Sequence, residues 1–352
     1  MAINRRKLLQ LGVGAAGVLL AGCQFGRVQA RRPALNFDAA HRYSVELGGH
    51  SLLAYQDGKI LYERYEPPFD ADLPIHMASA TKSFWGIVAA AMVDDGLLDF
   101  DEPAAKTLDE WRQDPVKSKI TVRHLLDLSS GLAEDIPAIQ GYKRRDTWAE
   151  DKYLHAIGLP LVSAPGSRFR YGPSHFYALG EVFKRKLGRD PLLYLDERIL
   201  QPIGCSYGSW VHDDAGNVHI PNGCYMTARN WLRFGQFVMA EGRLGKRQLI
   251  DARLIRACMA PSPANPGFGL TWWLNRPGGR GSNSTQNAPR DRVAGFIYRD
   301  GHPNMVAALG AGRNGLYLVP DLDLILVRQF SQDHATQVRF VDHGMFSALF
   351  DT

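Results

Sequence analysis

Strand-like sequence is confined to the two ends of the chain, and this limits the possible folds more than any other feature. Near the start, residues 49–55 and 59–65 flank Asp57-Gly58, and such a pair between two strand-like runs predicts a tight antiparallel hairpin. Residues 268–274, 304–310, 315–320 and 322–328 indicate further strands, and 341–350 a closing helix. The intervening sequence has helical periodicity, as at 120–128, 176–183 and 227–238. We therefore expect an α+β fold in which both chain ends form one antiparallel sheet that carries a mainly helical insertion.

Ser79 and Lys82 open the most apolar helical stretch, which continues from Phe84 to Met92. Residues at i and i+3 of a helix share one face, with about 5–6 Å between their Cβ atoms. A serine hydroxyl needs a neighbouring base, and a lysine can serve only if burial or nearby cations lower its pKa. The apolar helix favours that burial, and its first turn adds the positive end of the helix dipole. The pattern predicts an activated serine nucleophile, with a capping serine and a surface lysine as the alternative.

The Ser79-x-x-Lys82 pattern resembles the first motif of the penicillin-recognising serine hydrolases. The surrounding sequence resembles the branch that holds class C β-lactamases, related esterases, D-aminopeptidase-type enzymes and nylon-oligomer hydrolases. The phrases that carry this resemblance occur in the family's order at residues 120–126, 130–132, 164–171, 227–229 and 316–320. The resemblance spans nearly the whole mature chain, from the hairpin before residue 66 to the strand ending at Arg328, and it implies a β-lactamase/transpeptidase-like fold.

The family's second motif, Y-x-N, matches Tyr171-Gly172-Pro173. By this resemblance Tyr171 and Lys82 together form the general base, and the sequence leaves open which of them takes the proton. The alternative for Tyr171 is a core tyrosine. Pro173 departs from the motif, because proline offers no side-chain amide to a substrate's acylamino group.

The family's third motif falls at residues 308–312, where the lysine or histidine that would hold a β-lactam carboxylate is missing. The resemblance implies that the backbone N–H groups of Ser79 and Ala311 form an oxyanion hole, in which one donor is typically worth about 2.7–4 kcal/mol. Gly310 and Ala311 are small and would let a substrate lie close to the strand. A simple bulge or turn is the alternative.

These departures favour an esterase or amidase that works through an acyl-enzyme over a dedicated β-lactamase. A β-lactamase or D-alanyl-D-alanine carboxypeptidase-type cell-wall enzyme is one alternative, and a non-catalytic cell-wall-binding lipoprotein is another.

Candidate aromatic residues of the pocket are Trp272, Trp273 and Tyr142, with core packing as the other interpretation. His175 is expected to pack or cap, because no partner acid for a triad is evident. The sequence shows no metal-ligand spacing and no phosphate loop, so we expect no metal or cofactor, and a small ester, amide or peptide as substrate.

The first residues predict export and lipidation. Arg5-Arg6-Lys7 precedes a short apolar run, as in a signal peptide, and the arginine pair resembles a twin-arginine signal. Leu20-Ala21-Gly22-Cys23 resembles a lipobox, which implies cleavage before Cys23 and a lipid on its sulfur, and Gln24 favours the outer membrane. We expect a signal peptide at 1–22, a tether at 23–38 and a hydrolase domain at 39–352, facing the periplasm.

Cleavage would remove three basic residues and no acid, lowering the formal net charge from +5 to +2. No basic run interleaved with aromatics follows, so we expect no nucleic-acid partner. Cys205, Cys224 and Cys258 would then be left in an oxidising compartment. Buried thiols are the simpler expectation, and a Cys205–Cys224 disulfide is the alternative.

Overall fold

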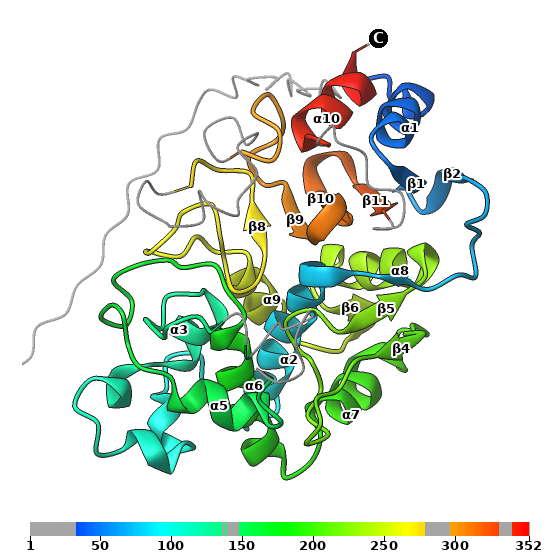
Figure 1. The fold of residues 1–352 in the computed structure, drawn as a ribbon. Helices are drawn as coiled ribbons and strands as arrows, with labels where there is room; N and C mark the ends of the chain where they lie inside the picture. The colour runs from blue at the N-terminus through cyan, green and yellow to red at the C-terminus, as the bar shows by residue number, and fades with distance from the viewer. Residues whose placement is uncertain (1–32, 136–137, 139–147, 279–295, 331–339, 352) are drawn as a thin grey trace, which may run out of the picture. The chain divides into compact units, whose positions relative to one another are not determined.

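The computed structural model describes residues 33–135, 138, 148–278, 296–330 and 340–351 (Figure 1). From Ala34 onward the chain forms one unit, which is described here. The predicted signal peptide, Cys23 and most of the predicted tether lie outside the described residues. In the described part of the chain, no helix is long and apolar enough to cross a lipid bilayer.

Within the described residues, a six-stranded sheet has the order β2-β1-β11-β10-β9-β8. Its strands are β1 (Gly49–Gln56), β2 (Lys59–Tyr65), β8 (Trp273–Leu274), β9 (Val306–Leu309), β10 (Gly315–Val319) and β11 (Leu324–Phe330). The hairpin turn has positive φ at Asp57 and Gly58, as a type I′ turn requires. β1 then pairs antiparallel with β11, Leu53 opposite Val327. The predicted sheet built from both ends of the chain is confirmed.

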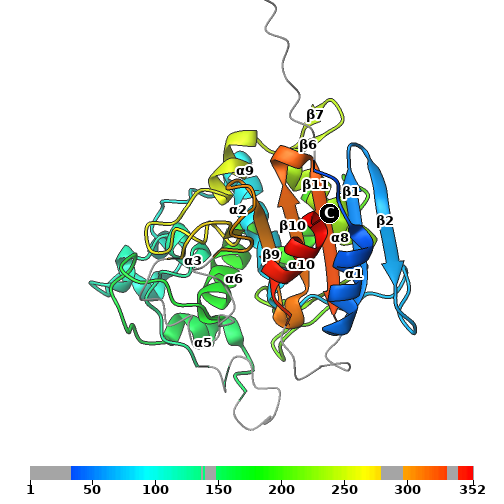
Figure 2. The ribbon, with the colours of Figure 1, turned by 90° about the horizontal axis from the view of Figure 1, so that it is seen from above.

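Helices cover both faces of this sheet. Helices α1 (Phe37–Glu46) and α10 (Asp342–Phe350) lie together on one face, and α8 (Ala228–Met239) lies on the other (Figure 2). Two successive residues of β10 show that both faces of the sheet are buried. Leu316 packs in the core shared with α8, and Tyr317 packs in the core shared with α10. This follows because successive side chains of a strand point to opposite faces of the sheet.

The helical insertion packs around α2 (Lys82–Asp94), in which every residue from Lys82 to Met92 is buried. A helix apolar on all sides needs neighbours on all sides. Helix α2 contacts α6 (Ser174–Leu187), α7 (Pro191–Leu195), the π-helix η6 (Asp196–Leu200) and α9 (Ala252–Cys258). Helices α3 (Val122–Leu126) and α5 (Lys152–Gly158) pack against α6. The smaller strands are β3 (Ile75–His76), β4 (Ser209–Trp210), β5 (Cys224–Met226), β6 (Arg243–Leu244) and β7 (Arg247–Gln248). Short 3₁₀ turns are η1 (Ala78–Thr81), η2 (Ala104–Lys106), η3 (Asp109–Trp111), η4 (Lys117–Lys119), η9 (Ala311–Arg313) and η10 (Pro320–Leu322).

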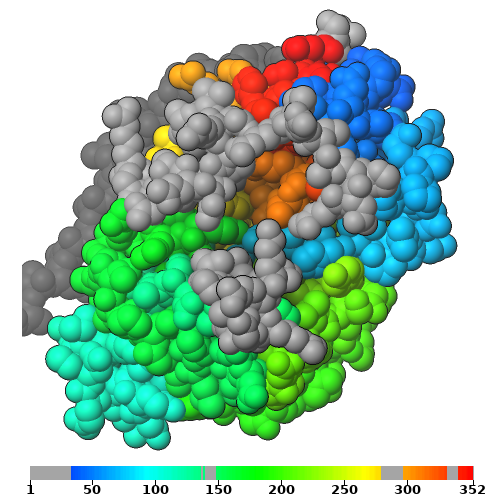
Figure 3. Space-filling view, viewed as in Figure 1, coloured from blue at the N-terminus to red at the C-terminus, as the bar shows by residue number. Residues whose placement is uncertain are grey.

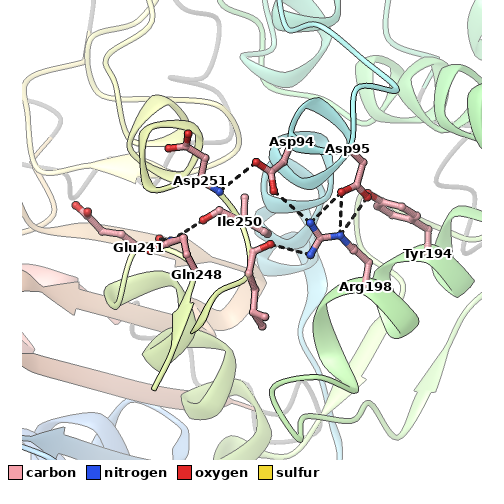
Figure 4. Close-up of polar contacts among 9 residues, drawn as sticks. Asp94, Asp95, Tyr194, Arg198, Glu241, Gln248, Ile250 and Asp251 are labelled. Carbon is pink, nitrogen blue, oxygen red and sulfur yellow. Dashed lines mark hydrogen bonds and ion pairs between the residues drawn. The ribbon is translucent and has the colours of Figure 1, made fainter. Parts of the chain in front are cut away.

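A polar cluster holds the C-terminal end of α2 (Figure 4). Arg198 of η6 pairs with Asp94 at 3.3 Å and Asp95 at 2.9 Å, and the Tyr194 hydroxyl donates to Asp95 at 2.6 Å. The backbone N–H of Asp251 reaches Asp94 from the segment before α9. These contacts tie α2 to two neighbouring segments at the end opposite Ser79.

Three details differ from the sequence expectation or decide between its alternatives. Helix α1 precedes the hairpin, so the folded unit does not begin with strands. The strand predicted at 268–274 is wrong except at Trp273–Leu274, because Thr271 has φ +78° and the Gly269 N–H bonds back to the Trp272 carbonyl. All three described cysteines are free and buried, which confirms the expectation of thiols and excludes the Cys205–Cys224 disulfide.

Candidate active site

Ser79 lies in the 3₁₀ turn η1, which joins β3 to α2. We expected it in the first turn of the α-helix, but regular α-helix begins only at Lys82. Ala78, just before Ser79, has φ +49°, a conformation that costs an alanine about 1–2 kcal/mol. The Thr81 hydroxyl donates to the Ala78 carbonyl at 2.7 Å and so holds the turn. The turn leaves Ser79 partly exposed while its neighbours Ala78 and Ala80 are buried.

Lys82 is buried and faces Ser79. Its Nζ lies 3.1 Å from Ser79 Oγ and donates to the Pro221 carbonyl at 3.0 Å. Burial lowers the pKa of Lys82 from 10.5 to about 7, and the charge of Glu134 partly opposes this effect. Near neutral pH a large fraction of the amine is therefore unprotonated and able to accept the Ser79 proton.

Tyr171 is brought to the same place from a distant part of the sequence. Lys82 Nζ lies 5.2 Å from the centroid of the Tyr171 ring and 5.4 Å from that of Phe176. The Trp273 ring stacks on the Tyr171 ring, with 5.6 Å between the ring centroids and 23° between the ring planes. The structure thus places the predicted serine and tyrosine beside the buried amine of the predicted lysine.

The end of β9 contacts the turn that carries Ser79. A Cβ on Gly310 would lie 2.1 Å from the Met77 carbonyl oxygen and 3.2 Å from the Ala80 nitrogen, so only glycine permits this approach. Ala311 opens the turn η9 and is exposed. Ser79 and Ala311 both belong to the first residues of a 3₁₀ turn, whose N–H groups have no acceptor within the turn. Two donors at the meeting of β9 and η1 can serve as the predicted oxyanion hole.

The turn η9 is supported by residues that the sequence did not single out. The buried Arg328 donates from Nη1 to the carbonyls of Gly312 and Arg313, each at 2.9 Å. Asn314 donates to the His76 carbonyl at 3.1 Å and accepts the Phe330 N–H at 2.8 Å. An arginine directly after the apolar run Leu324–Val327 of β11 was the available signal for this role.

Glu134 was also missed, although it lies only two residues after the family phrase at 130–132. Its side chain is 7% exposed, and Oε2 accepts the backbone N–H of Ser174 at 3.2 Å and the Ser174 hydroxyl at 2.8 Å. Burial raises the pKa of Glu134 to about 7, against the opposing hydrogen bonds from Ser174 and the charges of Arg170 and Lys82. The site therefore contains a buried acid that no motif identified.

His175 has a partner acid, contrary to the sequence interpretation, but not a usable serine. Its Nδ1 lies 2.7 Å from Ser130 Oγ, and its Nε2 lies 2.8 Å from the Arg170 carbonyl and 3.4 Å from Glu134 Oε1. Ser130 and His175 are fully buried, so a substrate cannot reach this hydroxyl. Burial lowers the pKa of His175 to about 4, which keeps the ring neutral and in a packing role.

Comparison with known proteins settles the family. The beta-lactamase family model matches residues 37–346. This chain belongs to the beta-lactamase family. The resemblance drawn from the motifs is thereby confirmed. On the face shown in Figure 3, orange residues from the C-terminal part of the chain lie beside blue residues from the N-terminal part.

Individual relatives are distant from this beta-lactamase family member. A monacolin J acid methylbutanoyltransferase of Aspergillus terreus is 31% identical over 158 residues, which cover 39% of this chain and 38% of that protein. A solved structure of a candidate beta-lactamase from Bacteroides dorei has a TM-score of 0.70 at 19% identity, covering 91% of this chain and all of that one. A candidate 6-aminohexanoate-dimer hydrolase from Bacillus anthracis has a TM-score of 0.67 at 19% identity, covering 87% and 79%. These likenesses confirm the β-lactamase/transpeptidase-like fold.

The three aromatic candidates for the pocket of this beta-lactamase family member separate. Trp272 is fully buried and stacks on Phe234, so it belongs to the core. Trp273 is partly buried and packs against Tyr171 and Phe268, which places it beside the site. Tyr142 lies outside the described residues. Among the described residues, no group of His, Cys, Asp or Glu side chains is arranged to hold a metal ion.

Proposed function

We propose that this beta-lactamase family member is a serine hydrolase of the esterase or amidase type, with Ser79 as its nucleophile. The observation that carries the proposal is the 3.1 Å approach of the buried Lys82 amine to a partly exposed serine hydroxyl. The lowered pKa of Lys82 makes that amine a base at neutral pH. Within the described residues Lys82 forms no salt bridge with a carboxylate, so ion pairing does not account for its burial, and a buried amine with a perturbed pKa beside a hydroxyl is typical of a functional site.

The proposed reaction has two halves. In acylation, Ser79 Oγ attacks the substrate carbonyl carbon while its proton passes to the Lys82–Tyr171 pair. The carbonyl oxygen takes up the displaced electron pair and is held by the N–H groups of Ser79 and Ala311. The bond to the leaving alcohol or amine then breaks, and the leaving group takes the proton. In deacylation a water molecule attacks the acyl carbon and gives its proton to the same pair. The bond from the acyl carbon to Ser79 Oγ then breaks, Oγ takes the proton back, and the carboxylic acid leaves.

The chemistry around β9 favours an uncharged acyl substrate. Ala308 and Leu309 occupy the strand where the family's cationic motif would stand, so this strand offers no ammonium or imidazolium to a substrate carboxylate. The relatives are named for acyl chemistry on both kinds of bond, an amide for the 6-aminohexanoate-dimer hydrolase and a methylbutanoyl group for the fungal transferase. A serine acyl-enzyme can form from either an ester or an amide, so these names support an ester or amide as the substrate class.

The test uses a Ser79→Ala variant with short-chain p-nitrophenyl esters and a fluorophosphonate label. Turnover and labelling are both expected to vanish, because the variant lacks the attacking oxygen. Ser118→Ala, in the distant turn η4, serves as the matched control and should keep both. Undiminished turnover in Ser79→Ala would refute the assignment. Mass spectrometry of the wild type after treatment with penicillin or with the fluorophosphonate adds a check. A Ser79 adduct from penicillin would indicate a cell-wall enzyme. The absence of an adduct from either reagent would indicate a binding protein.

We also propose that the chain is exported and anchored by a lipid on Cys23. The support is the sequence alone, in which a cationic start, a short apolar run and a lipobox-like Leu20-Ala21-Gly22-Cys23 follow one another. A Cys23→Ser variant should leave the membrane fraction of a Gram-negative host and lose incorporation of labelled fatty acid. Persistence of that variant in the membrane fraction would disprove the anchor.

A further inference from the structure

We propose that Glu134 is a positioning residue of this site, which fixes the segment carrying Tyr171 and supplies the negative charge that sets the basicity of Lys82. The inference rests on the proposed serine hydrolase function. It assigns a role to a buried carboxylate outside the three motifs from which the site was built.

The first argument is mechanical. Helix α6 begins at Ser174 with Pro173 as its N-cap, and Pro173 makes no side-chain capping bond. The carboxylate of Glu134 caps the helix instead, since Oε2 accepts both the N–H and the hydroxyl of Ser174. A Cβ on Gly172 would lie 2.0 Å from the Glu134 carboxyl carbon, so the carboxylate also fills the space beside the residue that follows Tyr171. Tyr171 is therefore held by a contact one residue away and by a cap three residues away.

The second argument is electrostatic. Oε1 of Glu134 is buried and makes no hydrogen bond within the described residues, although His175 Nε2 lies 3.4 Å away. A buried carboxylate oxygen without a donor is costly unless its charge acts on a neighbour. The charged groups that act on Glu134 are Lys82 from α2 and Arg170 from the loop before Tyr171, while His175 of α6 is neutral. Glu134 is in turn the carboxylate whose charge acts on Lys82.

The two arguments explain how a fully buried lysine can work as a base. Burial alone would make the amine too weakly basic to attract the Ser79 proton, and a nearby negative charge restores part of its basicity. The ionised form of Glu134 is favoured by the N-terminus of α6 and by the two Ser174 donors. The contacts of Glu134 with Ser174 and Gly172 thus favour its ionised form and also hold the segment that carries Tyr171. The position of Tyr171 and the protonation of Lys82 therefore depend on the same carboxylate.

The experiment measures the rate at which a fluorophosphonate labels Ser79 as a function of pH, in wild type and in Glu134→Gln. Glutamine can still accept from Ser174, so the fold should be kept while the charge is lost. The Lys82 ammonium is then less favoured, and the acid limb of the labelling rate is expected to move to lower pH by about one unit. Asp135→Asn is the matched control, because this neighbouring acid is 37% exposed and pairs with His155; its acid limb should not move.

A second variant keeps the test decisive if Glu134→Gln does not fold. Ser174→Ala removes one donor to the carboxylate, so Glu134 is less ionised near neutral pH, and the acid limb should move in the same direction by a smaller amount. If Glu134→Gln folds and the acid limb of its labelling rate does not move, the proposal is overturned. If Glu134→Gln does not fold, an unmoved acid limb in Ser174→Ala overturns it instead. Complete loss of labelling in a folded Glu134→Gln protein would overturn it too, since Glu134 would then take the proton itself. These results differ from failure of the proposed function, in which Ser79→Ala would keep its turnover.

Discussion

Replacing Lys82 by methionine should abolish activity and stabilise the fold. The lowering of the Lys82 pKa from 10.5 to about 7 corresponds to roughly 5 kcal/mol against the buried ammonium. Methionine fills a similar volume without a charge. The variant loses the hydrogen bond to the Pro221 carbonyl, and an unsatisfied buried carbonyl costs about 1–3 kcal/mol. Allowing for small packing changes, we expect a net gain of about 1–3 kcal/mol and, for a chain of this size, a Tm higher by about 1–4 °C.

The dependence on pH identifies the cause. A lysine whose pKa is lowered by folding destabilises the native state fully below its folded pKa of about 7, and this effect disappears as the pH rises towards the unfolded value of 10.5. The Tm difference between Lys82→Met and wild type should therefore be largest near pH 6 and small near pH 10, measured by thermal denaturation. Lys106→Met is the control, because the Lys106 side chain is 63% exposed and should give no such gain. A Tm difference that is the same at both pH values, or a less stable variant at pH 6, would contradict the reasoning.

Two further predictions concern the walls of the site. Gly310→Val should lower kcat at least about 100-fold in a folded protein, because its side chain displaces the Met77 carbonyl and with it the turn of Ser79; an unchanged kcat would show that β9 does not shape the oxyanion hole. Trp272→Ala should destabilise the core by about 3–5 kcal/mol, whereas Trp273→Ala should act mainly on the kinetics of ester hydrolysis. Denaturant titrations and kcat/KM values for the two variants separate these effects, and equal losses of stability would argue against placing Trp273 beside the site.

The sequence could predict the sheet and two of the three reactive side chains, Ser79 and Lys82, because their signals are local. The Asp57-Gly58 turn and the alternating strands specify the hairpin and the meander, and Ser79 and Lys82 stand within one turn of each other. The distant partner Tyr171 came only from a family pattern. Residues that act through tertiary contacts were not predictable in this way. Glu134 has the sequence pattern of an ordinary loop acid, and Arg328 stands out beside apolar strand residues without indicating its partners. Only the folded structure shows what their charged groups contact.

The error at residues 268–274 has a related origin. The apolar and aromatic residues there are typical of a strand, and nothing in the sequence marks Thr271 as a residue with positive φ. Close packing against Cys258 decides the backbone, since a Cβ on Gly269 would lie 2.3 Å from its carbonyl oxygen. Helix α1 was missed because its amphipathic pattern is short. The apolar face of that helix has a visible purpose only in the folded protein, where it packs against α10.

The pairing of β1 with β11 has a consequence for synthesis. Leu53 finds its partner Val327 only after almost the whole chain has left the ribosome, and contacts so remote in sequence form slowly. The strand that delivers Gly310 to the nucleophile is made equally late. We therefore expect a nascent chain that already carries Ser79 and Lys82 to lack hydrolytic activity until the final strands close the sheet.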